Sequence, residues 1–434
     1  MTQQAAYRLD GIYLQRQEGY FMQRVKLAAG TVSSIQARAV ADTALRFGRG
    51  EIHLTTRGSM EIHWLQEGDL PEVRRMLAMA GLTSRGACGG AVRGVSCSGT
   101  GMSRFPFLEE TARRIQQHFT ANPRFEGLPK KFKIGVEAGT AGRRHLIQDA
   151  GLVLTGGSDS APLFDLYLAG GLGREPQAGF LFEAAVTPQR ILPLLEAVIR
   201  VYSAHAPAGK RLKHLVWETG ENEFRRLVAQ EPAASEELPA RPGIPGGLTR
   251  QEEHSPLLAG VTGGQLSSTR LQDLAAFSDR WSGGVMTVTP DQDISFAVTD
   301  TDLLDEAART LDRAGFPPPP VTFRICPGSH QCRVGLSPTR DIARTLTETM
   351  STAGRSMTWA ISGCPNSCTQ PQLADIGIIT AGMHRDIQGE RVPYFDICLG
   401  SADGLGRVAA HALPLEELPG AVAQFVAGRS GFSG

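Results

Sequence analysis

Two short-spaced pairs of cysteines are the strongest chemical signal in this sequence of 434 residues. Cys326 and Cys332 enclose five residues in RICPGSHQC, and Cys364 and Cys368 enclose three residues in SGCPNSC. Four thiolates in two such pairs can surround one metal centre, which is either a tetrahedral zinc ion or an iron–sulfur cluster. Zinc ribbons favour two to four residues between paired cysteines, so the five-residue gap fits zinc poorly.

The other three cysteines, Cys88, Cys97 and Cys398, have no partner at short spacing. We expect them to be ordinary buried thiols. An odd total of seven cysteines, four of them in short pairs, indicates metal binding rather than disulfides in a reducing compartment.

Four basic residues in the first half of the chain could hold an anion. Arg57 lies in LTTRGSMEIHW, Arg93 in ACGGAVRGVSC, and Lys131 and Lys133 in LPKKFKIGVE. Residues two apart on a strand point to the same face, so the two lysines can converge while Phe132 packs behind them. Taken singly, each of these residues also fits a solvated surface charge.

An internal repeat indicates how these residues are positioned. The segment from Gly30 to Gly81 aligns without a gap on the segment from Gly264 to Gly315, at a constant offset of 234 residues. Each copy reads as a capped helix that begins at a Ser-Ser pair, followed by two strands in a hairpin. The repeat predicts a pseudo-twofold assembly with a site where the halves meet.

A longer segment follows each copy, and EPAASEELPARPGIPGG between the halves has the composition of a linker. The predicted order is therefore a small unit, a large lobe, a linker, a second small unit and a second large lobe, at residues 1–80, 81–232, 233–244, 245–316 and 317–434.

Charge and hydropathy exclude some classes of function. The 44 basic and 44 acidic residues balance, which argues against general affinity for nucleic acid or anionic membranes. The N-terminal segment does not resemble a signal peptide, and no apolar run reaches the roughly 20 residues of a membrane span. These features predict a cytoplasmic protein.

The second cysteine pair resembles the signature of the sulfite and nitrite reductase family. Ser362-Gly363-Cys364 leads to Cys368, and Asp375-Ile376-Gly377-Ile378 follows at the required distance. The resemblance implies that Cys326, Cys332, Cys364 and Cys368 hold a [4Fe–4S] cluster. It also implies that Cys368 bridges the cluster to the iron of a siroheme, with Asn366 beside the cofactor.

The same resemblance assigns the basic residues. Arg57, Arg93, Lys131 and Lys133 match the family's residues that bind substrate and siroheme. LAGGLGREP, with Gly170, Gly171 and Gly173, resembles its glycine-rich approach to the cofactor, where backbone N–H groups can meet carboxylates. The chain departs from the family at Gly58, where many members carry Gln.

The fold implied is α/β (α+β), with two ferredoxin-like small units and two larger lobes around the siroheme. The expected reaction is the six-electron reduction of sulfite to sulfide, with electrons from a separate donor such as ferredoxin or a reductase subunit. Three alternatives remain open: a nitrite reductase that forms ammonia, a precorrin-3B synthase, and a non-catalytic electron-transfer protein. The Lys131-Phe132-Lys133 pattern and Cys364-Pro365-Asn366-Ser367-Cys368 favour sulfite within the family.

Overall fold

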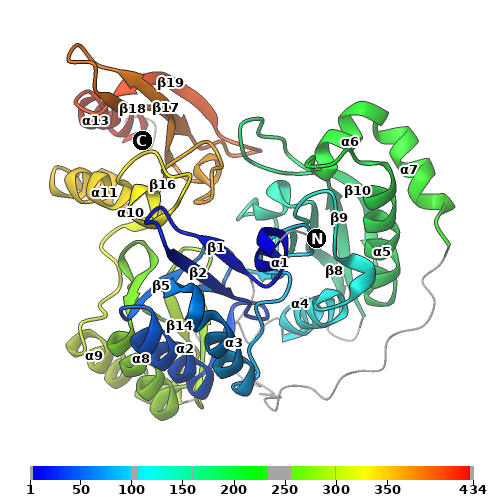
Figure 1. Ribbon diagram of the computed structural model, residues 1–434, viewed down its shortest axis with the longest axis horizontal. Helices are drawn as coiled ribbons and strands as arrows, with labels where there is room; N and C mark the ends of the chain where they lie inside the picture. Colours follow the sequence, from blue (N-terminus) through cyan, green and yellow to red (C-terminus); the bar gives the residue numbers. More distant parts are fainter. Residues whose placement is uncertain (1–2, 99–105, 159–160, 233–255, 299, 431–434) are drawn as a thin grey trace.

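The fold is built on four sheets, with helices packed around them (Figure 1). The computed structural model describes residues 3–98, 106–158, 161–232, 256–298 and 300–430. The predicted linker at 233–244 lies outside the described residues. Among the residues described, no helix is both long enough and apolar enough to cross a membrane.

The two small units form a pair of sheets that exchange a strand. One sheet has the order β1 (Ile12–Leu14), β2 (Tyr20–Val25), β5 (Met60–Gln66), β4 (Glu51–Leu54) and β12 (Gln265–Ser267). The other has the order β11 (Leu257–Ala259), β14 (Ile294–Phe296), β13 (Val285–Val288) and β3 (Thr31–Ser33).

The exchange is reciprocal to the residue. Ser33 pairs with Val285 on β13, and Ser267 pairs with Glu51 on β4. Ser267 is the repeat equivalent of Ser33, and Val285 is the repeat equivalent of Glu51, because each lies 234 residues further along the chain. The predicted pseudo-twofold duplication is therefore confirmed at the level of strand register.

The helices of the small units repeat the same offset. Helix α2 (Ser34–Phe47) is capped by the Ser33 side chain and α8 (Ser268–Trp281) by the Ser267 side chain, as the sequence predicts. Helices α3 (Leu70–Met79) and α9 (Leu304–Arg313) follow in the two copies. Buried side chains from both copies form one continuous hydrophobic core, so the two small units form a single packed body.

The two lobes are also copies of one topology. The sheet of the first lobe has the order β6 (Ser96–Cys97), β7 (Ile134–Glu137), β8 (Ala150–Ser158), β9 (Ala161–Leu168) and β10 (Phe180–Val186). The sheet of the second lobe has the order β15 (Thr322–Ile325), β16 (Thr358–Ser362), β17 (Ile376–Arg385), β18 (Arg391–Leu399) and β19 (Arg407–Pro414). In each sheet the first three strands are parallel and the last two antiparallel. The duplication thus extends beyond the segments that align in sequence.

Helices cover the lobe sheets and bury a separate core in each lobe. The first lobe carries α4 (Pro106–Phe119), α5 (Pro188–His205), α6 (Leu212–Thr219) and α7 (Glu221–Gln230), and the second carries α10 (Gly328–Gln331), α11 (Thr339–Glu348), α12 (Thr352–Arg355) and α13 (Leu418–Ser430). Helix α1 (Gln3–Leu9) precedes the first small unit. Short 3₁₀ turns lie at Glu67–Asp69, Pro123–Phe125, Arg144–Ile147, Thr262–Gly264, Thr301–Leu303 and Pro371–Leu373.

Candidate active site

A cavity of about 690 Å³ lies where the first small unit meets both lobes. Its wall includes all four paired cysteines and all four predicted basic residues, Cys326, Cys332, Cys364, Cys368, Arg57, Arg93, Lys131 and Lys133. The two groups are far apart in the chain, and the structure brings them to one space.

The cysteines lie at the carboxyl ends of two adjacent parallel strands. Cys326 directly follows β15, and Cys364 follows β16 with one residue between. Because parallel neighbours end at the same edge of a sheet, the two loops meet. The Gly363 N–H donates to Cys326 Sγ over 3.2 Å, which links the loops directly.

The four thiols line one cavity, at the point where the two loops meet. Burial raises the pKa of Cys326 to about 12 and that of Cys332 to about 11, and the charge of Cys368 adds to both shifts. Four thiolates that face one space are a ligand set that an iron–sulfur cluster uses.

Backbone N–H groups point at these sulfurs. Burial is the main reason that the pKa of Cys364 is raised, and N–H groups of Asn366 oppose that shift. The Val334 N–H acts in the same direction on Cys332. Such donors stabilise thiolates that ligate a metal centre.

The loop that contains Cys368 is bound to the turn that contains Arg57. Thr56 Oγ1 donates to the Cys368 carbonyl oxygen over 2.9 Å, and Gln370 Nε2 donates to the Thr56 carbonyl oxygen over 3.3 Å. The turn joins β4 and β5, as the hairpin prediction requires. Cys368 itself is exposed and lines the cavity.

Arg57 is held by the first lobe. Its Nη1 donates to Gln148 Oε1 over 2.7 Å, and its Nη2 donates to the carbonyl oxygens of Gly94 at 2.7 Å and Ile134 at 3.1 Å. Burial lowers the pKa of Arg57 to about 9, and the nearby charge of Arg93 lowers it further. These bonds fix the guanidinium beside the cavity.

Lys131 and Lys133 flank the fully buried ring of Phe132, in the extended segment that precedes β7. Asp149 Oδ2 accepts the Lys133 N–H over 2.8 Å, and the Phe132 carbonyl accepts the Arg93 N–H over 2.8 Å. Burial lowers the pKa of both lysines, that of Lys131 to about 8. Both lysines line the cavity, as the same-face argument predicts.

Sequence reasoning missed a third pair of basic residues in the wall, Arg24 and Lys26 on and just after β2. Lys26 is buried, and its Nζ donates to Thr120 Oγ1 over 2.9 Å. Burial and the charge of Arg93 lower its pKa to about 7. The sequence contained a signal for this pair, because Arg24 and Lys26 stand two residues apart around an apolar residue, as Lys131 and Lys133 do.

The wall is strongly cationic. Eight Lys and Arg side chains line it against two Glu side chains, Glu61 and Glu67. Buried charges without partners are costly, so the cavity favours an anionic occupant. Siroheme, which bears several carboxylates, and a small oxyanion together meet this requirement.

The glycine-rich segment makes its contacts within the first lobe. The Gly171 N–H donates to the Gln177 carbonyl oxygen over 2.8 Å, so it is not free to bind a carboxylate. The guanidinium of Arg211 occupies the space where a Cβ of Gly171 would lie, and its Nη2 donates to the Gly170 carbonyl oxygen over 3.1 Å. Neither glycine lines the cavity. Their role in cofactor binding stays a prediction.

Cys88, Cys97 and Cys398 are buried, as expected. Cys88 differs from an ordinary core thiol because Arg24 Nη1 lies 3.6 Å from its Sγ. Burial raises its pKa, and the charges of Arg24 and Arg93 oppose that shift.

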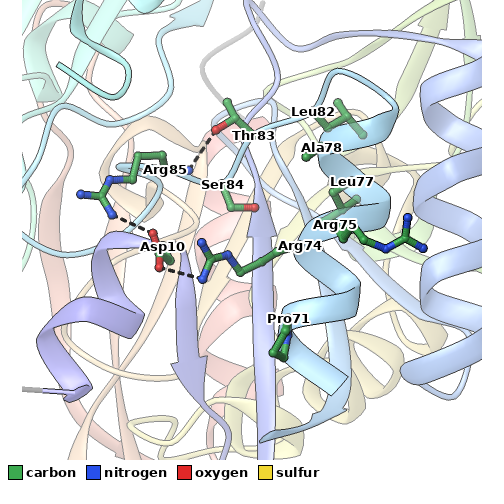
Figure 2. Close-up of a pocket in the computed structure, with 10 residues that line it drawn as sticks. All are labelled: Asp10, Pro71, Arg74, Arg75, Leu77, Ala78, Leu82, Thr83, Ser84 and Arg85. Atoms are coloured by element: carbon green, nitrogen blue, oxygen red, sulfur yellow. Dashed lines mark hydrogen bonds and ion pairs between the residues drawn. The ribbon is translucent and has the colours of Figure 1, made fainter. Parts of the chain in front are cut away.

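A second cavity of about 570 Å³ lies beside α3 and shares no lining residue with the first (Figure 2). Asp10 pairs there with Arg74 at 3.1 Å and with Arg85 at 2.8 Å. Arg85 also pairs with Glu126 at 2.6 Å. Two of the basic residues of this cavity are thus already paired with carboxylates, so it lacks the uncompensated charge of the first.

Four thiols in the wall of a cavity that favours anions characterise a redox enzyme that acts on an anion. Two family models match the chain. Residues 13–80 match the nitrite/sulfite reductase ferredoxin-like half domain, and residues 89–236 match the nitrite and sulphite reductase 4Fe-4S domain.

Known proteins of similar length support the same family. "Sulfite reductase [ferredoxin] 1" of Mycolicibacterium paratuberculosis is 26% identical, over 95% of this chain and 83% of its own length. "Ferredoxin--nitrite reductase" of Synechococcus elongatus is 28% identical, over 95% of this chain and 87% of its own length. The solved structure of the NirA protein of Mycobacterium tuberculosis superposes with a TM-score of 0.82 at 25% identity, over 97% of this chain and 86% of that one.

The chain belongs to the nitrite and sulfite reductase family. Its cofactors are accordingly a [4Fe–4S] cluster and siroheme. The four thiols and the cationic side chains that line the cavity both fit these groups.

Proposed function

We propose that this protein reduces sulfite to sulfide with electrons from a ferredoxin. The observation that carries the proposal is the convergence of Arg57, Arg93, Lys131 and Lys133 on the cavity that also contains Cys368. Hydrogen sulfite takes up six electrons and six protons to give HS⁻ and three waters. When bound, the siroheme and the cluster would supply the iron that binds sulfur and the one-electron store.

The four cysteines would hold the cluster, with Cys368 shared with the siroheme iron. All four cysteines line the cavity, and Cys368 is the exposed member of the set, which supports this role. Asn366 would support the Cys364 thiolate through its N–H groups.

The basic residues would bind the substrate oxygens and replace the water that a dianion loses on entry. Arg57 is anchored by three hydrogen bonds, so it would orient the anion without moving. Lys131 is the better proton donor, because its pKa of about 8 lets it donate and recover a proton near neutral pH.

Sulfite is preferred over nitrite because of the cavity's charge. In the family's nitrite reductases the second lysine of this segment is typically replaced by Asn within a Lys-Trp-Asn pattern, which suits a monoanion. Here Lys133 is a cavity residue beside Phe132. The loop Cys364-Pro365-Asn366-Ser367-Cys368 also differs from the Cys-Ala-Lys-Gly-Cys usual in precorrin-3B synthases.

The donor is inferred from the relatives, whose names specify ferredoxin for both the sulfite and the nitrite enzymes. A non-catalytic electron-transfer protein would have no use for a cavity lined by eight basic side chains.

The deciding experiment uses protein produced with a supply of siroheme, after its visible spectrum, iron and acid-labile sulfide confirm both cofactors. Reduced methyl viologen drives the reaction, and kcat/KM is measured for sulfite and for nitrite. We expect a clearly higher value for sulfite and stoichiometric sulfide as product. A strong preference for nitrite would refute the proposal. If the protein consumed neither sulfite nor nitrite, the proposal would also fail, and the protein would be one that only transfers electrons.

A further inference from the structure

A buried histidine on β5 has no role in the reaction proposed above. His63 is 3% exposed and lines the cavity together with Glu61, two residues earlier on the same strand. Met60 and Ile62 point the other way, into the hydrophobic core. Strand alternation thus directs Glu61 and His63 towards the cavity.

A β-bulge ends this alternation immediately after His63. Phe21 pairs with Leu65 and Gln23 with Ile62, so Met22 alone is opposite His63 and Trp64. Trp64 has a φ of +65°, which is strained for a bulky side chain, and its N–H donates to Gln15 Oε1 over 2.5 Å. Bulges near active sites commonly re-aim a side chain, and this one returns Leu65 to the core.

The face that bears His63 is bound to the segments that contain the cysteines. Gln15 pairs through its backbone with Cys332, and Gln331 Nε2 donates to Glu51 Oε2 over 2.7 Å. The negative charge of Glu61 contributes to the raised pKa of Cys332, after burial and the charges of the other cysteines. This face therefore lies against the cysteine-bearing loop of residues 326–332.

A neighbouring histidine is already engaged. His53 Nε2 lies 3.2 Å from Gln292 Nε2, and Gln292 in turn bonds both the N–H and the carbonyl oxygen of Ile325, the residue before Cys326. The rings of His53 and His63 are 6.4 Å apart.

His63 has one ring nitrogen without a hydrogen-bond partner within the described part of the chain. Its Nε2 lies 3.4 Å from Glu61 Oε2, and its Nδ1 has no partner. Arg24 bonds the other oxygen of that carboxylate, because its Nε donates to Glu61 Oε1 over 3.0 Å. A buried polar atom without a partner is costly, which implies that a partner for Nδ1 is supplied when the cavity is filled.

The duplicated small unit provides an internal comparison. The positions equivalent to His53, Glu61 and His63 are Thr287, Ser295 and Ala297 in the second copy. The two copies share their strand register and their core, so the fold does not require these ionisable groups. They occur only in the copy whose sheet faces the cysteine loop.

We propose that the His63 imidazole donates a hydrogen bond to the [4Fe–4S] cluster or one of its cysteine sulfurs, and thereby raises the cluster's reduction potential. The inference rests on the proposed assignment of the four cysteines to the cluster. A neutral imidazole carries one N–H, and rotation of the ring brings either nitrogen to the cavity. His63 is a positioning residue: it does not touch the substrate in this proposal.

The physical reason is electrostatic. A cluster held by four thiolates is anionic and gains a further negative charge when it takes an electron. A hydrogen bond to sulfur stabilises the reduced form more than the oxidised form, and so raises the potential.

The test measures the midpoint potential of the cluster in the holoenzyme by redox titration followed by EPR. We expect His63→Leu to shift the potential to a more negative value, and His63→Gln, which keeps an N–H donor, to shift it less. His145→Leu is the matched control, because His145 is also 3% exposed with an unpartnered Nδ1 but does not line the cavity. It should leave the potential unchanged.

Pulsed EPR of the wild-type holoenzyme labelled with ¹⁵N-histidine tests the same contact. This experiment does not require that a substituted protein folds. We expect a weak nitrogen coupling to the reduced cluster. Three results would overturn this inference but leave the cysteine assignment standing. They are the absence of this coupling, an unchanged cluster potential in His63→Leu, and a shift that is confined to the siroheme potential. A wild-type protein without any cubane signal would overturn both the cysteine assignment and the inference.

Discussion

Arg57 and Asp291 occupy the same turn position in the two copies of the small unit, yet they carry opposite charges: Arg57 binds the first lobe, and Asp291 binds both lobes. Arg57 donates to Gln148 in the first lobe, beside the cavity. Asp291 lies 2.9 Å from Arg144 of the first lobe and 3.5 Å from Arg324 of the second. The pseudo-twofold site that would mirror the cavity is therefore crossed by an ion-pair network between the lobes. One copy supplies a cation for an anionic ligand, while the other supplies an anion that joins the two lobes.

Replacement of Cys368, which we propose as the bridge, should affect both cofactors. We expect Cys368→Ser to change the siroheme spectrum and to lower the iron and acid-labile sulfide content, because this thiol both belongs to the set of four and faces the cavity. Cys398→Ser is the control, since Cys398 is buried in β18 outside the cavity. Visible spectra with iron and sulfide analysis decide the result. Loss of the cluster from Cys398→Ser, with Cys368→Ser intact, would refute the ligand assignment.

The duplication and the cysteine set could be predicted from the sequence because both are local patterns. An ungapped offset of 234 residues fixes the equivalence of Ser33 and Ser267, and the structure pairs their strands at that offset. The duplication of the lobes was not visible, because the two sheets share strand order and direction but not residues that align. Topology of this kind becomes apparent only when the strands are paired.

Residues whose roles depend on distant partners were the least predictable. Gly171 looked like a free backbone donor, but its space and its N–H are taken by Arg211 and Gln177. Gly58 departs from the family's Gln for a reason seen only in three dimensions. Its φ is +64°, and a Cβ there would lie 2.9 Å from the Cα of Gly30.

The ion pair between Asp149 and Arg211 should be important for both stability and the position of Lys133. The two side chains are 2.7 Å apart and at most 5% exposed, and Asp149 also accepts the Lys133 N–H. Asp149→Asn leaves the Arg211 charge buried without its partner, so we expect a loss of about 3–5 kcal/mol in the free energy of unfolding. Chemical denaturation measures it.

The control for this variant is Glu223→Gln, which removes one member of the exposed pair with Arg226. Exposed pairs contribute little, so its denaturation midpoint should match that of the wild type. An equally small effect for Asp149→Asn would contradict the role assigned to the buried pair.

The stability of the cofactor-free protein should rise between pH 7 and pH 9. Burial lowers the pKa of Lys26 to about 7 and that of Lys131 to about 8 in the folded state, against 10.5 when exposed. In this window the unfolded chain binds more protons than the folded chain, so each lysine raises the free energy of unfolding by up to about 1.4 kcal/mol per pH unit. Above pH 9 the raised pKa values of Cys326 and Cys332 act in the opposite direction and offset the contribution of the lysines.

Denaturation at several pH values tests this prediction. Lys26→Met should reduce the slope, and Lys210→Met should not, because Lys210 is exposed. A flat or falling profile from pH 7 to pH 9 would show that these lysines are not desolvated in the cofactor-free protein.

The last prediction concerns the choice of substrate. Lys133 lines the cavity, where burial and the charge of Lys131 disfavour its ammonium form unless an anion is bound nearby. Lys133→Asn removes a charge-assisted contact worth about 1.5–3 kcal/mol, which corresponds to a loss of about 10- to 150-fold in kcat/KM for sulfite if the contact persists in the transition state. Nitrite is a monoanion and needs less positive charge, so its kcat/KM should be spared or raised. Lys130→Asn is the matched control, because Lys130 is an exposed neighbour that does not line the cavity. Unchanged sulfite kinetics in Lys133→Asn, or an equal loss for both anions, would remove the basis for calling sulfite the substrate.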